Sequence, residues 1–313
     1  MKKYCSVLLA VVMLGLSGCN STPSEPQQTN STTADKIEYT IYYSSEATLR
    51  ERPARQEITG EKAPKIAYVR AETKKFDLLT RNAIDPNPNT VQSRTITIGG
   101  KEVTVNYQDS YAGAFSECSV DELKENSFYD RYAIDEGGAE GDNINIHFFR
   151  STGKVQSYMD YNARQAEGGE LTEAQALQKA EAELIALYGE DIFARYEFET
   201  TSISDNLIYI VYRHFICDYK TTEFILLSYN LQGQLASLDF ANPDLFASVE
   251  DQITVEAIQK AEPLLRESIP DGLDTIGTMI VMDAEGVAYL RINGYRTDDT
   301  GYKYYCEYYI NLY

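Results

Sequence analysis

Few side chains in this chain have the types and the spacing that catalysis requires. A catalytic zinc site needs His, Cys or carboxylate ligands at fixed intervals, as in His-Glu-x-x-His. The chain has two histidines, His147 and His214, and each lies in a strand-like run with no ligand pattern after it. We therefore interpret both as structural histidines, and we expect neither a metal nor another cofactor.

Other catalytic chemistry is as poorly supported. The sequence contains no Gly-x-Ser-x-Gly elbow and no P-loop, and two histidines leave little scope for a Ser-His-Asp or Cys-His system. Carboxylate pairs hydrolyse glycosides, but among 48 acidic residues such pairs are expected by chance. The acidic, glycine-rich segment 135–143 lacks the spacing of a calcium loop and is interpreted as a plain loop. The sequence predicts that the protein is not an enzyme; a hydrolase with an unusual carboxylate site is the remaining catalytic alternative.

Tyrosines at the end of the chain form the one candidate binding surface. Residues 302–313 alternate as a strand does, and even-numbered positions from Tyr302 to Leu312 are expected to face the core. The opposite face then carries Tyr305, Tyr309 and Tyr313, which supply rigid amphipathic contact area if that face meets solvent. Cross-strand aromatic pairing is the alternative interpretation of the same three residues.

The overall charge narrows the choice of partner. A net charge of −20, with no cluster of Lys and Arg, repels phosphate backbones, so we exclude nucleic acid. The 25 Tyr and absence of Trp favour sheet, because Tyr suits a half-buried pleated surface.

A targeting signal is predicted at the start of the chain. Two lysines precede a short apolar run at residues 7–16, which ends in Leu16-Ser17-Gly18-Cys19. This ending resembles a bacterial lipobox; an ordinary cleaved signal with an incidental cysteine is the alternative. The resemblance implies cleavage before Cys19, lipidation of its sulfur, and a location at the extracytoplasmic face of the cell membrane through a lipid anchor. Residues 19–36 are polar and are expected to form a flexible tether.

A helix and its repeat must organise the rest of the chain. Residues 171–188 show a Thr172–Gln175 capping box and an apolar stripe at helical spacing. The sequence of residues 176–181 is repeated, with one substitution, at residues 257–262. Pro263 follows this second copy and predicts a shorter or bent helix there. Strand-like hairpins are predicted near 95–105, 144–158 and 224–240. By the repeat offset the last copy lacks its closing strand, which leaves an open edge that can accept a peptide.

Residues of the central copy suggest a family. The Leu-Thr-Glu opening at 171–173, the Ala176 and Ala180 spacing, and strands closing on a glycine turn resemble a PepSY-type module, and tandem copies behind a lipobox resemble PepSY-like lipoproteins. The resemblance implies an α+β fold of tandem modules, each a helix packed on a small antiparallel sheet, with the terminal copy truncated. It brings no catalytic residues.

The expected organisation follows from the repeat. It comprises a signal peptide, the tether, and three folded segments, which are an α+β region with a partial module (37–165), a PepSY-like module (166–250) and a truncated second module (251–313).

Three further cysteines are interpreted as buried free thiols, with one disulfide and one remaining thiol as the alternative: Cys118, Cys217 and Cys306.

The sequence therefore favours a non-catalytic lipoprotein that binds a protein or peptide outside the cell. Modulation of a secreted protease is the version that the family resemblance suggests. The alternative is a surface lipoprotein that binds a small molecule or glycan through its exposed tyrosines.

Overall fold

The computed structural model describes residues 28–29, 39–45, 67–68, 80–114, 128–134, 143–282, 286–299 and 301–313. The chain divides into two compact units. Unit 2 comprises Thr80–Phe215 and Thr221–Leu245, and unit 1 includes Ile216–Lys220 and Phe246–Tyr313. Among the described residues, no helix is long and apolar enough to cross a membrane.

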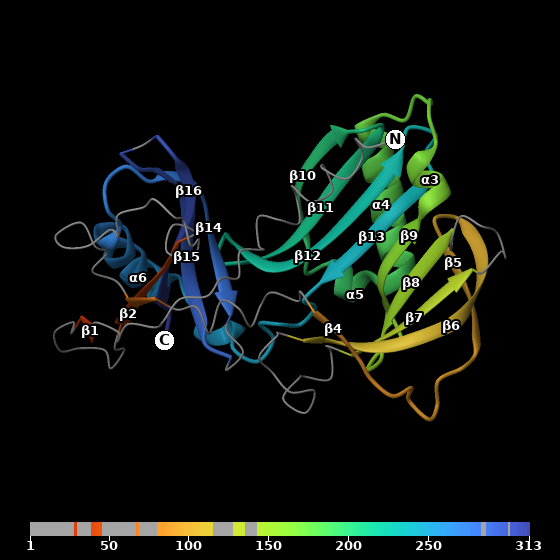
Figure 1. The fold of residues 1–313 in the computed structure, drawn as a ribbon, viewed down its shortest axis with the longest axis horizontal. Helices are drawn as coiled ribbons and strands as arrows, with labels where there is room; N and C mark the ends of the chain where they lie inside the picture. The colour runs from red at the N-terminus through yellow and green to blue at the C-terminus, as the bar shows by residue number, and fades with distance from the viewer. Residues whose placement is uncertain are drawn as a thin grey trace. The chain divides into compact units, whose positions relative to one another are not determined.

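Unit 2 is built on one antiparallel sheet, seen at the right of Figure 1. The three predicted hairpins form as expected, with Gly99, Gly153 and Gly233 at positive φ in their turns. The sheet order is β10 (Glu197–Ser204), β11 (Leu207–Ile216), β12 (Tyr219–Asn230), β13 (Leu235–Ala241), β9 (Val155–Asp160), β8 (Ile144–Phe149), β7 (Phe128–Ile134) and β6 (Lys101–Ala114), which pairs with both β4 (Thr80–Ala83) and β5 (Ser93–Ile98).

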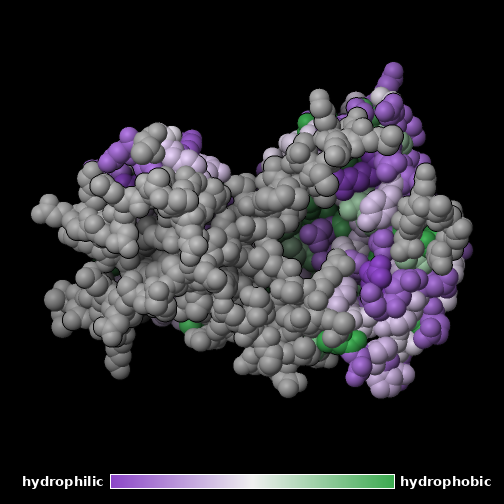
Figure 2. Space-filling model, in the orientation of Figure 1, coloured by the Kyte–Doolittle hydropathy of each residue, from purple (hydrophilic) through white to green (hydrophobic). Residues whose placement is uncertain are grey.

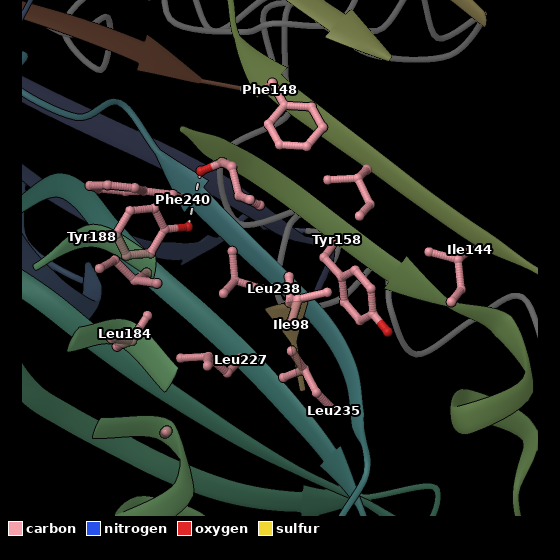
Figure 3. Packing of buried hydrophobic residues seen from close by; sticks show 14 of the residues in the cluster. Ile98, Ile144, Phe148, Tyr158, Leu184, Tyr188, Leu227, Leu235, Leu238 and Phe240 are labelled. Carbon is pink, nitrogen blue, oxygen red and sulfur yellow. Dashed lines mark hydrogen bonds between the residues drawn. The ribbon is translucent and has the colours of Figure 1, made fainter. Parts of the chain in front are cut away.

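Helix α4 (Glu173–Tyr188) covers one face of this sheet and completes its core. The predicted capping box is present, since the Thr172 hydroxyl accepts from the Gln175 amide and the Gln175 side chain accepts from the Thr172 amide. Ala176, Ala180 and Leu184 are buried against strand residues of the same cluster. Figure 3 shows Tyr188 at the end of the helix, beside Phe240, with its hydroxyl donating to the Val155 carbonyl at 3.0 Å.

Two short helices complete unit 2. They are α3 (Tyr161–Gln165), which follows β9, and α5 (Glu190–Phe193), which follows α4. Ala163 of α3 packs with Leu207, Tyr209 and Ala236 in a small separate cluster.

Unit 1 contains a second antiparallel group of strands and a helix. Strands β14 (Asp274–Met282), β15 (Ala288–Thr297), β16 (Lys303–Asn311) and β2 (Tyr39–Ser45) pair in that order. Strand β1 (Gln28–Thr29) pairs antiparallel with β2, whereas β3 (Ala67–Tyr68) pairs with it in parallel. The 3-10 turn η6 (Glu250–Gln252) precedes helix α6 (Val255–Ser268), which contacts β15, β16 and β2.

The two copies of the repeated sequence form equivalent helices. The Thr254 hydroxyl accepts from the Ala257 amide and so caps α6, as Thr172 caps α4. Ala180 and Ala261 are both completely buried. The prediction of a shorter second helix is confirmed, because α6 has 14 residues against 16 for α4, with Pro263 inside it.

The expected fold class is nevertheless wrong. In the described residues the strands form a sixteen-stranded sheet with a continuous path of twelve strands, and the parallel β2–β3 pair makes it mixed. Tandem modules with separate small sheets would end at their own edges. Here β13 instead pairs with β9 of the preceding hairpin, because an exposed strand edge is satisfied by the nearest complementary edge. The sheet therefore dominates, and each helix covers only part of it.

Candidate functional site

The predicted tyrosine surface lies on a strand that is buried on both faces. The expected core face is confirmed, since Tyr304, Cys306, Tyr308 and Ile310 are buried. The opposite face does not meet solvent as predicted: Tyr305 is 9% and Tyr309 is 3% exposed, and Tyr313 is half-buried. A strand that is paired on both sides lies inside its sheet, and alternation alone cannot reveal whether its second face is covered.

These tyrosines belong to a network around a buried carboxylate on the same strand. The hydroxyls of Tyr305 and Tyr309 donate to Glu307, at 3.0 and 2.7 Å. Arg291 of β15 binds the same carboxylate with Nη1 at 3.0 Å, and Asn293 donates to the Tyr305 hydroxyl at 2.6 Å. Burial, and then the Glu307 charge, raise the pKa of Tyr305. Buried hydrogen-bond networks of this kind rigidify a core.

Tyr313 also has structural partners. Its hydroxyl donates to the Gly286 carbonyl at 2.8 Å and accepts from the Ala288 amide at 3.2 Å. Ligand binding by Tyr305, Tyr309 and Tyr313 stays a prediction. The glycan-binding alternative depends on exposed tyrosines, and the burial of two of the three gives it no support.

The open edge predicted beside the last strand is occupied by the chain itself. Strand β2 pairs antiparallel with β16, from Ile41 opposite Ile310 to Ser45 opposite Cys306. A segment more than two hundred residues earlier therefore supplies the strand that the repeat lacks. Sequence reasoning missed this pairing because a strand-like run carries no mark of its partner.

Both histidines are held by neighbouring side chains. The hydroxyls of Tyr111 and Ser157 lie 2.9 and 2.8 Å from Nδ1 of His147. His214 lies 3.4 Å from the fully buried Glu223, measured from Nδ1 to Oε2. Because the Glu223 side chain has no exposed surface, a substrate cannot reach it in this structure. In the described part of the chain, no group of three His, Cys, Asp or Glu side chains is arranged to hold a metal ion.

Glu223 is the centre of a second buried cluster. The Tyr196 hydroxyl donates to its Oε2 at 3.2 Å, and Nη2 of Arg195 lies 3.8 Å away. Burial, and then the Glu223 charge, raise the pKa of Tyr196. Arg195 also pairs with Asp244. This arrangement joins the start of β10 to β11 and β12 through charged side chains.

Asp239 carries a carboxyl group with a raised pKa. Burial raises the pKa of Asp239 on β13 to about 6, although the amide Nε2 of Gln156 donates to its Oδ1 at 2.8 Å and opposes the shift. Asp239 lies opposite Ser157 in the β9–β13 ladder. The Gln156 amide that binds its carboxyl group is a structural partner.

A shallow groove of about 670 Å³ lies beside the N-terminus of α4. Its walls are formed by three glutamines, two leucines, one glutamate, one lysine, one alanine and one glycine, and no tyrosine: Gly169, Glu170, Leu171, Gln175, Gln178, Lys179, Ala182, Leu231 and Gln232. Gly169 lies close to the Leu231 carbonyl. The charged residues of the lining are Glu170 and Lys179.

The most distinctive exposed feature is strand β10 at the edge of the unit 2 sheet. In the described residues β10 pairs with β11 alone, so its second side is a strand edge. Phe198 is 48% and Ile203 is 58% exposed, and both belong to the few large apolar side chains left in solvent. Figure 1 shows β10 as the outermost strand beside β11, and Figure 2 shows mostly hydrophilic residues on the visible described surface. An apolar pair on a strand edge is therefore unusual here.

A bulge places both apolar side chains on one face of the sheet. The register shifts between Phe198 and Thr200, so Phe198 pairs with Tyr212 and Ile203 with Ile208. Tyr212 and Ile208 both belong to the core cluster that α4 covers. The sequence analysis missed this site, because Phe198 and Ile203 are an odd number of residues apart and simple alternation assigns them to opposite faces.

The two described cysteines only partly match the prediction of buried free thiols. Cys217 and Cys306 form no disulfide, and Cys306 is buried, but Cys217 is only half-buried. Burial raises the pKa of Cys217. Cys118, the predicted lipidation residue Cys19 and most of the acidic segment 135–143 lie outside the described residues.

Comparisons with known proteins found one similar solved structure. No protein-family model matches the chain, and no curated protein matches it. Among solved structures the chain is similar to the YpeB C-terminal domain of Bacillus megaterium, with a TM-score of 0.31 and 11% identity over 56% of this chain and 81% of that one. No argument about function rests on it.

Proposed function

We propose that this protein is a non-catalytic lipoprotein, anchored to the extracytoplasmic face of the cell membrane, that binds a protein or peptide. The lipobox-like ending at Cys19 and the polar tether support the anchor and the location. The observation that carries the binding role is the edge strand β10 with its two exposed apolar side chains.

An exposed strand edge with apolar side chains supports a binding role because other chains tend to pair with it. Unpaired backbone groups beside exposed apolar side chains invite another chain to pair, so proteins usually shorten, charge or cover a strand edge. Strand β10 has eight residues and keeps Phe198 and Ile203 in solvent. An exposed apolar feature of this kind is typical of an interaction surface.

The test is capture of the partner followed by binding of the purified partner. The mature chain, residues 19–313, is immobilised and exposed to native envelope extract, and a retained protein is identified and purified. We expect the purified partner to bind the wild-type chain. Recovery of no protein above a heat-denatured control, or failure of the purified protein to bind, would overturn the proposal.

The protease version needs its own measurement. The PepSY-type resemblance suggests that the bound protein is a secreted protease whose activity this chain modulates. Adding the mature chain to secreted proteases of the same cell is expected to change their rate of peptide hydrolysis. An unchanged rate at concentrations that saturate the partner contradicts this version and leaves the binding role intact.

A further inference from the structure

We infer that β10 binds an extended, positively charged segment of the partner as an added β-strand. This inference rests on the proposed binding function and names the chemistry of the partner. Strand addition supplies affinity through main-chain hydrogen bonds and specificity through alternate side chains.

The apolar pair defines one face of the added strand. Phe198 contacts the Tyr212 ring with centroids 6.1 Å apart, so it extends the core at the sheet edge. Ile203 extends it in the same way beside the fully buried Ile208. A strand paired with β10 directs every second side chain to this same face, where apolar residues would cover the exposed pair.

The opposite face of β10 is polar and favours polar side chains on the added strand. Thr200 pairs with Val211 and Ser202 with Tyr209, on the face away from α4. These short hydroxyl side chains leave the backbone accessible. The added strand is therefore expected to alternate apolar and polar residues.

Acidic groups around β10 select a basic partner. Glu197 is exposed on the strand, and Glu181 of α4 is near enough to raise the pKa of Tyr212, after burial. Two arginines near β10 already have carboxylate partners, Arg213 with Glu199 and Arg195 with Asp244. Glu197 and Glu181 attract an incoming Lys or Arg, which favours its association.

The same charges disfavour a second copy of this chain as the occupant. Two β10 strands paired with each other would bring two such acidic edges together, on chains whose net charge is −20 before processing. Like charges placed opposite one another destabilise a strand pair. The favoured occupant is therefore a basic, alternating segment of another protein.

Three synthetic peptides test the inference against the mature chain. The first alternates Val and Thr with Lys at both ends, the second has Glu in place of Lys, and the third is the Lys peptide with N-methyl groups on the amides of both edges. We expect the Lys peptide to bind, measured by fluorescence anisotropy, and the other two to bind at least about tenfold more weakly, since each lacks the charge or the hydrogen bonds. The N-methyl groups block strand pairing while leaving side chains and charge unchanged.

A matched pair of variants locates the binding. Ile203→Lys places a charge on the β10 edge, whereas Val91→Lys makes the same change at an apolar residue that is 48% exposed and lies outside β10. We expect Ile203→Lys to weaken the Lys peptide about tenfold and Val91→Lys to leave it unchanged. Circular dichroism and thermal unfolding establish that both variants are folded.

Several results would overturn the inference. They are an absence of binding by the Lys peptide, equal binding by the N-methylated peptide, and equal binding by Ile203→Lys. A dimer in sedimentation that Ile203→Lys dissociates would assign the edge to a second copy instead. If the purified natural partner still binds Ile203→Lys with unchanged affinity, strand addition at β10 fails while the proposed binding function stands.

Discussion

At the scale of single residues, a close contact between two backbone segments, rather than side-chain chemistry, determines the position of the residues before α4. A Cβ placed on Gly169 would lie 2.1 Å from the carbonyl oxygen of Leu231, and Gly169 has a φ of +117°. The Leu171 amide donates to that same carbonyl at 2.9 Å. Only glycine fits where the two backbones meet, and this contact sets the start of the helix against the β12–β13 turn.

Gly169→Ala is therefore expected to destabilise the protein. The backbones must separate and the Leu171 hydrogen bond must stretch, at a cost of about 2–4 kcal/mol in the free energy of unfolding. Gly168→Ala is the control, because Gly168 also has a positive φ but no atom within 4 Å of an added Cβ. Urea unfolding of both variants measures the difference, and equal losses would show that only the φ angle matters.

Asp239 is expected to make stability depend on pH. Its pKa in the folded chain is about 6, above the ordinary value of 3.8, so the folded state holds the proton more tightly than the unfolded state does. Stability from this group is then fully present below about pH 4, falls as the pH rises to 6, and stays lower above that. Asp239→Asn keeps an oxygen for the Gln156 amide and removes the charge.

We expect Asp239→Asn to be more stable than the wild type at pH 7.5, by on the order of 1–3 kcal/mol, and to lose this advantage near pH 4. Denaturant unfolding at the two pH values measures it. A constant difference between the variant and the wild type across this range would contradict the raised pKa.

At the scale of elements, the sequence correctly predicted local features but did not predict which strands pair. The capping box at Thr172, the glycine turns and the shortened second helix each depend on a few neighbouring residues, and each is present. The pairing of β2 with β16 and of β9 with β13 joins segments far apart in sequence. Those pairings decide the fold class, and no local pattern specifies them.

At the candidate site, too, the sequence predicted the local pattern but not the features that depend on distant strands. The alternation at the C-terminal strand correctly identified its core face, but Tyr305 and Tyr309 on the opposite face are buried as well. The edge position of strand β10 depends on the order of the whole sheet. Its one-sided apolar pair depends further on a bulge that the sequence does not mark.

Helix α4 is expected to tolerate enlargement on one side only. Ala180 is completely buried against the sheet, whereas Ala174, on the same helix, is exposed. Ala180→Leu should overpack the core and lower the free energy of unfolding by about 1–3 kcal/mol. Ala174→Leu should change it by less than about 0.5 kcal/mol. Similar losses in both variants, measured by thermal unfolding, would contradict the packing described here.

At the scale of the whole molecule, the sheet determines which parts of the chain can fold alone. The predicted module 166–250 contains α4 and β10–β13 but excludes β9, to which β13 is hydrogen-bonded. The core under α4 also includes Tyr158 and Ile146 from the excluded hairpin. A fragment cut at residue 166 would expose both the edge of β13 and part of this apolar surface.

We therefore expect the fragment 166–250 to lack a cooperative unfolding transition, and the fragment 80–250, which spans all of unit 2, to show one. The longer fragment retains the sheet from β4 to β10 and all three hairpins whose apolar residues share the core cluster with α4. Far-ultraviolet circular dichroism during urea titration distinguishes a sigmoidal from a gradual loss of structure, because cooperative unfolding requires a completed core. If the shorter fragment unfolded cooperatively with the longer one's midpoint, the β9–β13 pairing would contribute nothing to stability, and the module boundaries predicted from the repeat would be the physical ones.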